Sequence, residues 1–272
     1  MPKLMTLNTH SLEEKEMDRK QQIFADTVSE LLPDVIALQE VNQLSDSAPE
    51  SEIPETCVPV QKAVPLKAGN HALQVSRLLE ANGTPYYWAW LPIKVGYDKY
   101  DEGVALFSRK PILETADLPL SMIQDFSNYR TRRLLGIRTE DGWFFSVHTS
   151  WWNDPDEPFL HQWEEMQKAA KTRKPAVLMG DFNGDAMVRN ETYDRIAKDG
   201  WYDSYVLAKN KDAGWTVAGT IDGWHDQEAA DARRIDQIWL DQPMTVKSSE
   251  VIFNGDNYPV ISDHFGILIE TE

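Results

Sequence analysis

Apolar residues along the chain gather in short runs that have the length and composition of β-strands. The run at residues 34–40 follows Pro33, has Val35-Ile-Ala-Leu38 as its apolar centre and ends on the carboxylate of Glu40. A short apolar run bounded by a turn residue is typical of a buried strand. Similar runs occupy residues 4–8, 86–91, 103–109, 134–138, 143–149, 176–179, 234–240, 246–253 and 265–269. The pattern therefore predicts a chain rich in strands.

A smaller number of segments carry apolar residues at helical spacing. Ser11 and Glu14 have the spacing of a capping box, and residues 23–31 continue the helix that this box would open. Further helices are predicted over residues 72–81, 158–171 and 191–198. Many strands with few interspersed helices favour an α/β (α+β) fold in which two packed sheets are flanked by helices.

Two segments lack a clear period and are expected to be loops. Residues 42–69 are rich in Ser, Pro and Glu, and residues 94–102 are strongly charged. No internal repeat divides the rest of the sequence. Since 272 residues can bury one sizeable core, we expect residues 1–272 to form a single domain.

Composition and charge narrow the class of protein. A hydrophobic fraction of 42% favours a globular protein, and the sequence has no long apolar run for a membrane span and no apolar secretory signal at its start. The single cysteine, Cys57, fits a reducing compartment, so a cytoplasmic protein is expected. A net charge of −17 would repel long nucleic acid, which favours a small substrate.

Several polar residues stand where the predicted strands end, which is where layered folds usually carry their sites. They are Asn8, Glu40, His148, Asp181, Asn183, Asp236, Asp263 and His264. Each one alone is usually a turn former or a helix cap. Four carboxylates in one cleft would repel each other unless a cation neutralised them, and oxygen ligands favour Mg²⁺ or Mn²⁺ over zinc. Two nearby histidines could donate to a phosphoryl oxygen, so the set indicates phosphate chemistry.

The sequence resembles the endonuclease/exonuclease/phosphatase superfamily, which includes deoxyribonuclease I-like and inositol phosphatase-like enzymes. The residues that carry the resemblance are Thr6-Leu-Asn8, Leu38-Gln-Glu40, Gly103-Val-Ala-Leu-Phe-Ser-Arg109, Ser146-Val-His148-Thr, Gly180-Asp181-Phe-Asn183, Arg234-Ile-Asp236 and Ser262-Asp263-His264. The resemblance implies a four-layered sandwich of two mixed sheets flanked by helices. It also implies a metal-dependent phosphoric ester hydrolase with Mg²⁺, or Mn²⁺ as a substitute.

The resemblance also implies roles for these residues. Glu40 would be a metal ligand, Asn8 and Asp263 would lie at the metal, Asp181 would orient or deprotonate the attacking water, and Asn183 would hold the scissile phosphate or a metal.

The two histidines of the set would each be held by a carboxylate. Asp236 would pair with His148, and Asp263 would hold His264, whose imidazolium would stabilise the negative charge that grows on the phosphoryl group. His10, His161 and His225 receive no role.

Substrate-binding residues are predicted on weaker grounds. Of Arg130, Arg132 and Arg133, one is expected to bind phosphate, with Arg132 as the candidate and surface solvation for the other two. Trp151 and Trp152 follow His148 closely.

Aromatic faces suit the apolar faces of sugars, although core packing is the usual fate of a tryptophan. Trp151, Trp152 and Trp224 are the candidate sugar contacts, with Trp215 as further aromatic surface.

A second resemblance concerns the substrate. Its residues are Thr6-Leu-Asn-Thr-His10, His148-Thr-Ser-Trp-Trp152, Gly219-Thr-Ile-Asp-Gly-Trp224 and Phe253-Asn-Gly255. They are similar to the branch of the superfamily that includes maltose 6'-phosphate phosphatases, which implies a cytoplasmic enzyme acting on a phosphorylated disaccharide. The alternatives are a metal-dependent nuclease or other phosphodiesterase, and an inactive protein that binds phosphorylated ligands. The sequence predicts no oligomeric state.

Overall fold

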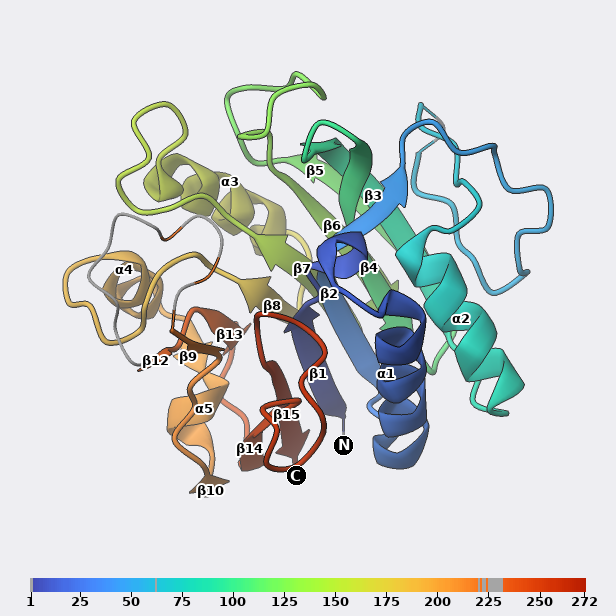
Figure 1. Cartoon of the computed structure of the whole chain (residues 1–272). Helices are drawn as coiled ribbons and strands as arrows, with labels where there is room; N and C mark the ends of the chain where they lie inside the picture. The colour runs from blue at the N-terminus through green and yellow to red at the C-terminus, as the bar shows by residue number, and fades with distance from the viewer. Residues whose placement is uncertain (1, 62, 220, 222–223, 225–231) are drawn as a thin grey trace.

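Two β-sheets pack face to face, and helices cover their outer faces (Figure 1). This computed structural model describes residues 2–61, 63–219, 221, 224 and 232–272. The expected two-sheet sandwich flanked by helices is confirmed.

The first sheet is mixed and has seven strands in the order β10-β14-β15-β1-β2-β4-β3. Its strands are β1 (Lys3–Asn8), β2 (Val35–Leu44), β3 (Tyr87–Gly96), β4 (Tyr100–Ser108), β10 (Asn210–Lys211), β14 (Val246–Ile252) and β15 (Gly266–Thr271). Strand β1 runs parallel to β2 and antiparallel to β15. Helices α1 (Met17–Leu31) and α2 (His71–Ala81) cover the outer face.

The second sheet has six strands in the order β5-β6-β7-β8-β13-β9. Its strands are β5 (Glu114–Pro119), β6 (Arg133–Thr139), β7 (Gly142–His148), β8 (Ala176–Asp181), β13 (Asp236–Leu240) and β9 (Tyr202–Asp203). Strands β7 and β8 are parallel, whereas the other neighbours are antiparallel. Helix α3 (Phe159–Lys171) packs on the outer face, and α4 (Thr192–Lys198) contacts α3. Four short elements complete the described set: η1 (Ser11–Glu13), α5 (Ser204–Leu207), β11 (Val217–Ala218) and β12 (Ala232–Arg233).

The central strands are buried on both faces. Leu4 of β1 lies in the apolar cluster between the sheets, and its neighbour Met5 lies in the cluster beneath α1 and α2. Successive side chains of a strand point to opposite faces, so a strand covered on both sides needs a continuous apolar run. This burial explains why short apolar runs, rather than alternating patterns, marked these strands.

Two local expectations are wrong. The segment 94–102 is not a loop, because β3 and β4 extend through it and leave only residues 97–99 between them. Ser11 and Glu14 form no capping box, since α1 begins at Met17 and the carboxylate of Glu14 instead contacts the side chains of His10 and Lys20.

Among the described residues, no helix has both the length and the apolar character needed to span a bilayer.

Candidate active site

Four strand ends and the middle of β2 bring the predicted polar residues to one edge of the sandwich. Asn8 ends β1 opposite Gln39 in the middle of parallel β2, and His148 lies opposite Asp181 at the ends of parallel β7 and β8. Asp236 begins β13 and also lies opposite Asp181, because β13 runs antiparallel to β8. The two sheets thus present their polar ends to the same pocket.

An irregularity in β2 directs Glu40 into this pocket. The pairing of β2 with β4 shifts register between Leu38 and Val41, and Glu40 has a φ of 53°. A bulge of this kind re-aims a side chain that would otherwise follow the strand's alternation. The amide Nδ2 of Asn8 then donates to Glu40 Oε1 over 2.9 Å and to Asp181 Oδ2 over 3.2 Å, which ties the two carboxylates together.

The tight turn after β8 holds Asp181. Its Oδ1 accepts a 2.8 Å hydrogen bond from the backbone N–H of Asn183. The preceding Gly180 has a φ of +148°, and a Cβ added there would lie 2.0 Å from the backbone oxygen of Val147. Only glycine fits this close approach between β7 and β8.

The carboxylate that holds His264 is Asp236, not Asp263. His264 Nδ1 lies 2.9 Å from Asp236 Oδ2, and both side chains are buried. The expected pairings of Asp236 with His148 and of Asp263 with His264 are therefore wrong. Asp263 instead lies 3.8 Å from His10 Nδ1, on the other side of the segment's bend from the Asp236 contact.

Burial and mutual repulsion raise the pKa values of two site carboxyls. Burial, together with the charge of Asp236, raises the pKa of Asp181 to about 7, although His264 opposes the shift. Burial and the charge of Glu102 raise the pKa of Glu40. The carboxylates are therefore crowded, which is the condition that a bound cation relieves.

The two histidines of the site differ in charge. Burial lowers the pKa of His264, but Asp236 overcomes that effect and raises the pKa to about 10, which makes this side chain an imidazolium. Burial and the nearby cations of Arg132 and Lys94 hold the pKa of His148 well below its ordinary value. His148 is therefore neutral near pH 7, with Nε2 3.8 Å from Asp181 Oδ2 and 4.0 Å from Glu40 Oε1.

The donor set fits a hard divalent cation. Glu40, Asp181 and Asp263 all line the pocket and offer carboxylate oxygens, and burial together with neighbouring carboxylates raises the pKa values of the first two. Carboxylate oxygens favour Mg²⁺ and related ions. Asn8 presents its amide nitrogen to the carboxylates, because its oxygen accepts from the backbone N–H of His10.

The pocket around these groups has a volume of about 370 Å³. Three aromatic side chains form part of its wall: Tyr97, Tyr129 and Trp151. Lys94 and Glu102, from β3 and β4, line it as well, although the sequence assigned them no role. They were missed because the charged segment was interpreted as a loop, whereas β3 and β4 extend through it.

Of the candidate substrate residues, Arg132 and Trp151 line the pocket. Trp152 does not, since it packs against Phe159 of α3 with ring centroids 6.0 Å apart. Trp224 is also buried, and its Nε1 donates to Asn183 Oδ1 over 3.2 Å, so it contacts a site residue rather than the pocket.

Arg130 and Arg133 are engaged in ion pairs rather than merely solvated. The guanidinium of Arg130 lies 3.3 Å from the carboxylate of Asp154, and that of Arg133 lies 2.7 Å from Asp117. His225 and most of the block from residue 220 to 223 lie outside the described residues.

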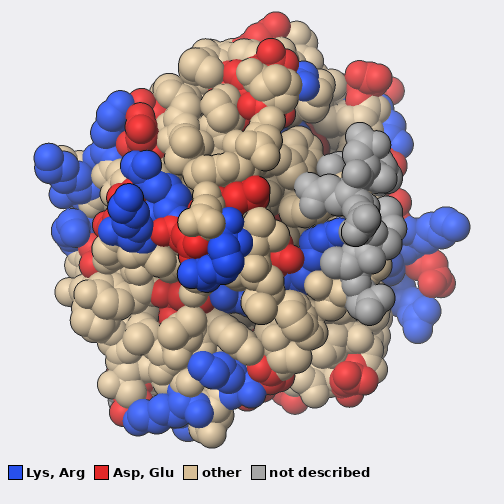
Figure 2. All heavy atoms as spheres, turned by 90° about the vertical axis from the view of Figure 1, so that its left-hand side faces the viewer, with Lys and Arg blue, Asp and Glu red and all other residues tan. Residues whose placement is uncertain are grey.

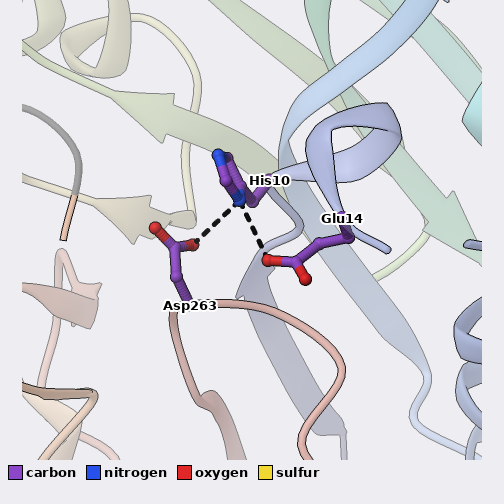
Figure 3. Close-up of side chains that lie close together, drawn as sticks. All are labelled: His10, Glu14 and Asp263. Carbon is purple, nitrogen blue, oxygen red and sulfur yellow. Dashed lines mark hydrogen bonds and ion pairs between the residues drawn. The ribbon is translucent and has the colours of Figure 1, made fainter. Parts of the chain in front are cut away.

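His10, which the sequence left without a role, also lines the pocket. Figure 3 shows its ring between two carboxylates, with Nδ1 2.9 Å from Glu14 Oε1 and 3.8 Å from Asp263 Oδ1. Glu14 also pairs with Lys20, which already compensates its charge. We therefore assign no second metal to this cluster, and interpret His10 as a contact that orients Asp263.

A two-sheet sandwich with carboxylates and histidines in one pocket at its edge is the architecture of a metal-dependent phosphoesterase. A model of the Endonuclease/Exonuclease/phosphatase family matches residues 5–264. The chain belongs to this family. It is therefore a phosphoric ester hydrolase, and the family typically uses a divalent metal. No curated protein matches the sequence.

Solved structures of the same fold support the assignment. A family member from Leptotrichia buccalis C-1013-b is 31% identical, with a TM-score of 0.87 and full coverage of both chains. A mannosyl-6-phosphatase from Bacteroides thetaiotaomicron has a TM-score of 0.62 and a 3' phosphatase from Neisseria, bound to a product DNA hairpin, one of 0.64; each is 18% identical with full coverage of both chains. At that identity the last two show the fold alone.

Proposed function

We propose that this chain is a Mg²⁺-dependent phosphomonoester hydrolase that acts on a phosphorylated sugar. A phosphorylated disaccharide such as maltose 6'-phosphate is the first candidate. The observation that carries the proposal is a pocket whose floor holds the charged site and whose walls include aromatic side chains.

The aromatic wall suits a sugar. Tyr97 and Tyr129 are each about half exposed, and with Trp151 they offer apolar ring faces beside the charged floor. The apolar faces of a sugar ring pack on such surfaces, while its hydroxyls remain free for polar contacts. The Bacteroides neighbour, named a mannosyl-6-phosphatase, illustrates that this fold can accompany activity on a sugar phosphate.

Asp181 is the proposed proton acceptor, and His264 is the proposed hydrogen-bond donor to the phosphoryl group. The pKa of Asp181 is about 7, so its carboxylate can take a proton from the attacking water near neutral pH. His264, held as an imidazolium by Asp236, donates to a phosphoryl oxygen. Neutral His148 carries one ring N–H and can donate a single hydrogen bond to the same group.

Glu40 and Asp263 are the proposed metal ligands, with Asn8 holding Glu40 in place. A bound Mg²⁺ would neutralise charge on the phosphoryl oxygens and the leaving oxygen, and Mn²⁺ is the expected substitute. Asn183 is proposed to contact the phosphate through the second N–H of its side-chain amide, because Trp224 occupies the side-chain oxygen and the first N–H donates to the backbone oxygen of Thr149 over 2.8 Å.

The test is release of inorganic phosphate from a panel that contains maltose 6'-phosphate, glucose 6-phosphate and a DNA hairpin with a 3'-phosphate. Each substrate is assayed with Mg²⁺ and with a chelator. Chelator-sensitive release concentrated on the disaccharide supports the proposal, and Asp181→Asn should abolish it while the protein stays folded. Normal turnover by Asp181→Asn would overturn the assigned role of this residue.

The panel also tests the two alternatives. On the face shown in Figure 2, separate groups of Lys and Arg side chains lie beside Asp and Glu side chains, and they form no continuous basic track among the described residues that this view shows, so this face does not favour a groove for long nucleic acid. Cleavage of DNA without release from sugar phosphates would instead identify a nuclease or phosphodiesterase. Binding of phosphorylated ligands without any turnover would identify a silent binding protein.

We also propose that residues 1–272 act as one domain in the cytoplasm. The two sheets share one apolar cluster, which predicts a single unfolding transition in urea. Cys57 is a free thiol, in keeping with a reducing compartment. Two separated transitions, or recovery of the protein outside the cytoplasmic fraction, would contradict these proposals.

A further inference from the structure

Two buried cationic side chains, Lys94 and Arg132, line the pocket beside the charged floor. Lys94 is 9% exposed, and its Nζ lies 3.0 Å from Glu102 Oε1. Lys94 on β3 and Glu102 on β4 lie opposite each other, next to a register shift at Ile93. Because such an irregularity re-aims side chains, this pair turns toward the pocket as Glu40 does on β2.

Arg132 has donors that the protein leaves unused. Its Nη1 donates to the backbone oxygens of Tyr129, over 2.8 Å, and Thr131, over 3.2 Å. Its Nε is fully buried and makes no hydrogen bond to any described residue. Among the described residues no carboxylate lies at ion-pair distance from Arg132, whereas the neighbouring Arg130 and Arg133 both form such pairs. A buried guanidinium without an anion is costly, so its position points to an anionic ligand.

The effects on neighbouring groups locate both cations at the reaction site. The charges of Lys94 and Arg132 lower the pKa of His148, after the larger effect of burial. Burial lowers the pKa of Arg132, and the charges of Glu102, Glu40 and Asp181 oppose that effect through space. Both cations therefore lie within electrostatic reach of the groups that would handle the scissile phosphate.

We propose that Lys94 and Arg132 bind the terminal oxygens of a phosphate dianion and thereby select phosphomonoesters over phosphodiesters. The inference rests on the proposed phosphatase function and names the residues that set its substrate class. A monoester carries a charge of about −2 near neutral pH and three free oxygens, whereas a diester has a single charge and two free oxygens. Two cations therefore stabilise a bound monoester more than a bound diester, and the second ester group of a diester would compete for the same space.

The experiment compares para-nitrophenyl phosphate with bis(para-nitrophenyl) phosphate, two substrates with the same leaving group. The measured quantity is the ratio of kcat/KM for the monoester to kcat/KM for the diester, with Mg²⁺ present. Arg132→Gln and the double variant Lys94→Met with Glu102→Gln are tested, since the double variant leaves no buried carboxylate unpaired. Lys110→Met is the matched control, because this lysine pairs with Glu140 and Asp141 on an exposed edge.

We expect the ratio to fall by about tenfold or more in both test variants and to stay constant in the control. Inorganic phosphate should inhibit the same two test variants more weakly than it inhibits the wild type. Circular dichroism and the midpoint of urea unfolding identify any variant that has lost its fold. The ratio of kcat/KM values is then judged on the test variant that remains folded. An unchanged ratio in a folded variant overturns the inference while the phosphatase proposal stands. A wild type that prefers the diester overturns the proposed function itself.

Discussion

His71 makes the stability of this protein dependent on pH. It begins α2 and is almost fully buried, and its Nδ1 lies 3.3 Å from Gln21 Nε2. Burial lowers the pKa of His71 from its ordinary value of 6.5 to about 4. Between these two pKa values the unfolded chain binds the proton and the folded chain does not, so stability is lost as the pH falls through this window.

The size of the effect follows from the two pKa values. Lowering the pH from about 7.5 to about 5 should reduce the free energy of unfolding by about 2 kcal/mol through this histidine alone, and the loss should reach about 3 kcal/mol below both pKa values. A domain has about 5–15 kcal/mol of stability in total, so this one group has a visible effect.

The assay is urea unfolding of the wild type and of His71→Asn at several pH values. The amide of asparagine can retain the contact with Gln21, and any packing loss shifts the variant equally at every pH. The difference between the two curves therefore isolates the titration of His71. We expect the variant's stability relative to the wild type to improve by about 2 kcal/mol between about pH 7.5 and about pH 5. Parallel curves would refute the reasoning.

Three further predictions concern the site and its support. Asp236→Asn should lower kcat/KM by about 10–100-fold, because it weakens the hold on His264, and a folded variant with normal activity would sink this role. Arg234→Gln should reduce the free energy of unfolding by about 3 kcal/mol in urea, because it leaves the buried carboxylate of Asp203 without its 2.8 Å ion pair. Gly180→Ala should cost about 3 kcal/mol or more on the same measure, because the added Cβ has no room beside β7.

Matched controls separate these causes from general disturbance. Arg138→Gln removes an exposed pair with Glu114 and should cost less than about 1 kcal/mol. The Cβ added by Gly83→Ala would meet no atom within 4 Å, so only the φ of +75° should reduce the free energy of unfolding, by about 1–2 kcal/mol. A control that cost as much as its test variant would contradict the assigned cause.

Local patterns were sufficient to predict the layered fold and most of the site. Apolar runs marked the central strands because those strands are covered on both faces, and the polar residues at their ends were visible as interruptions of the runs. Asn8, Glu40, His148, Asp181 and Asp236 were predicted in this way. In the structure Glu40, His148 and Asp181 line one pocket, while Asn8 and Asp236 lie behind it and contact residues of its lining.

The sequence alone did not determine which groups pair. Asp236 faces His264 because β13 and β15, which belong to different sheets, lie in contact where the sheets pack, and this is a property of the tertiary structure rather than of spacing. Likewise, the opposite charge states of the two site histidines depend on neighbours that come from other strands.

The sequence by itself determined the class of fold, the identity of the charged residues and the chemistry that such a set performs, because these depend on side-chain type and local periodicity. The tertiary structure decided that residues 94–102 form a hairpin, that Lys94 and Arg132 reach the pocket, and that Trp152 and Trp224 pack inside. The physical reason is that burial, register shifts and through-space charge arise between segments far apart in the chain, where local periodicity carries no information.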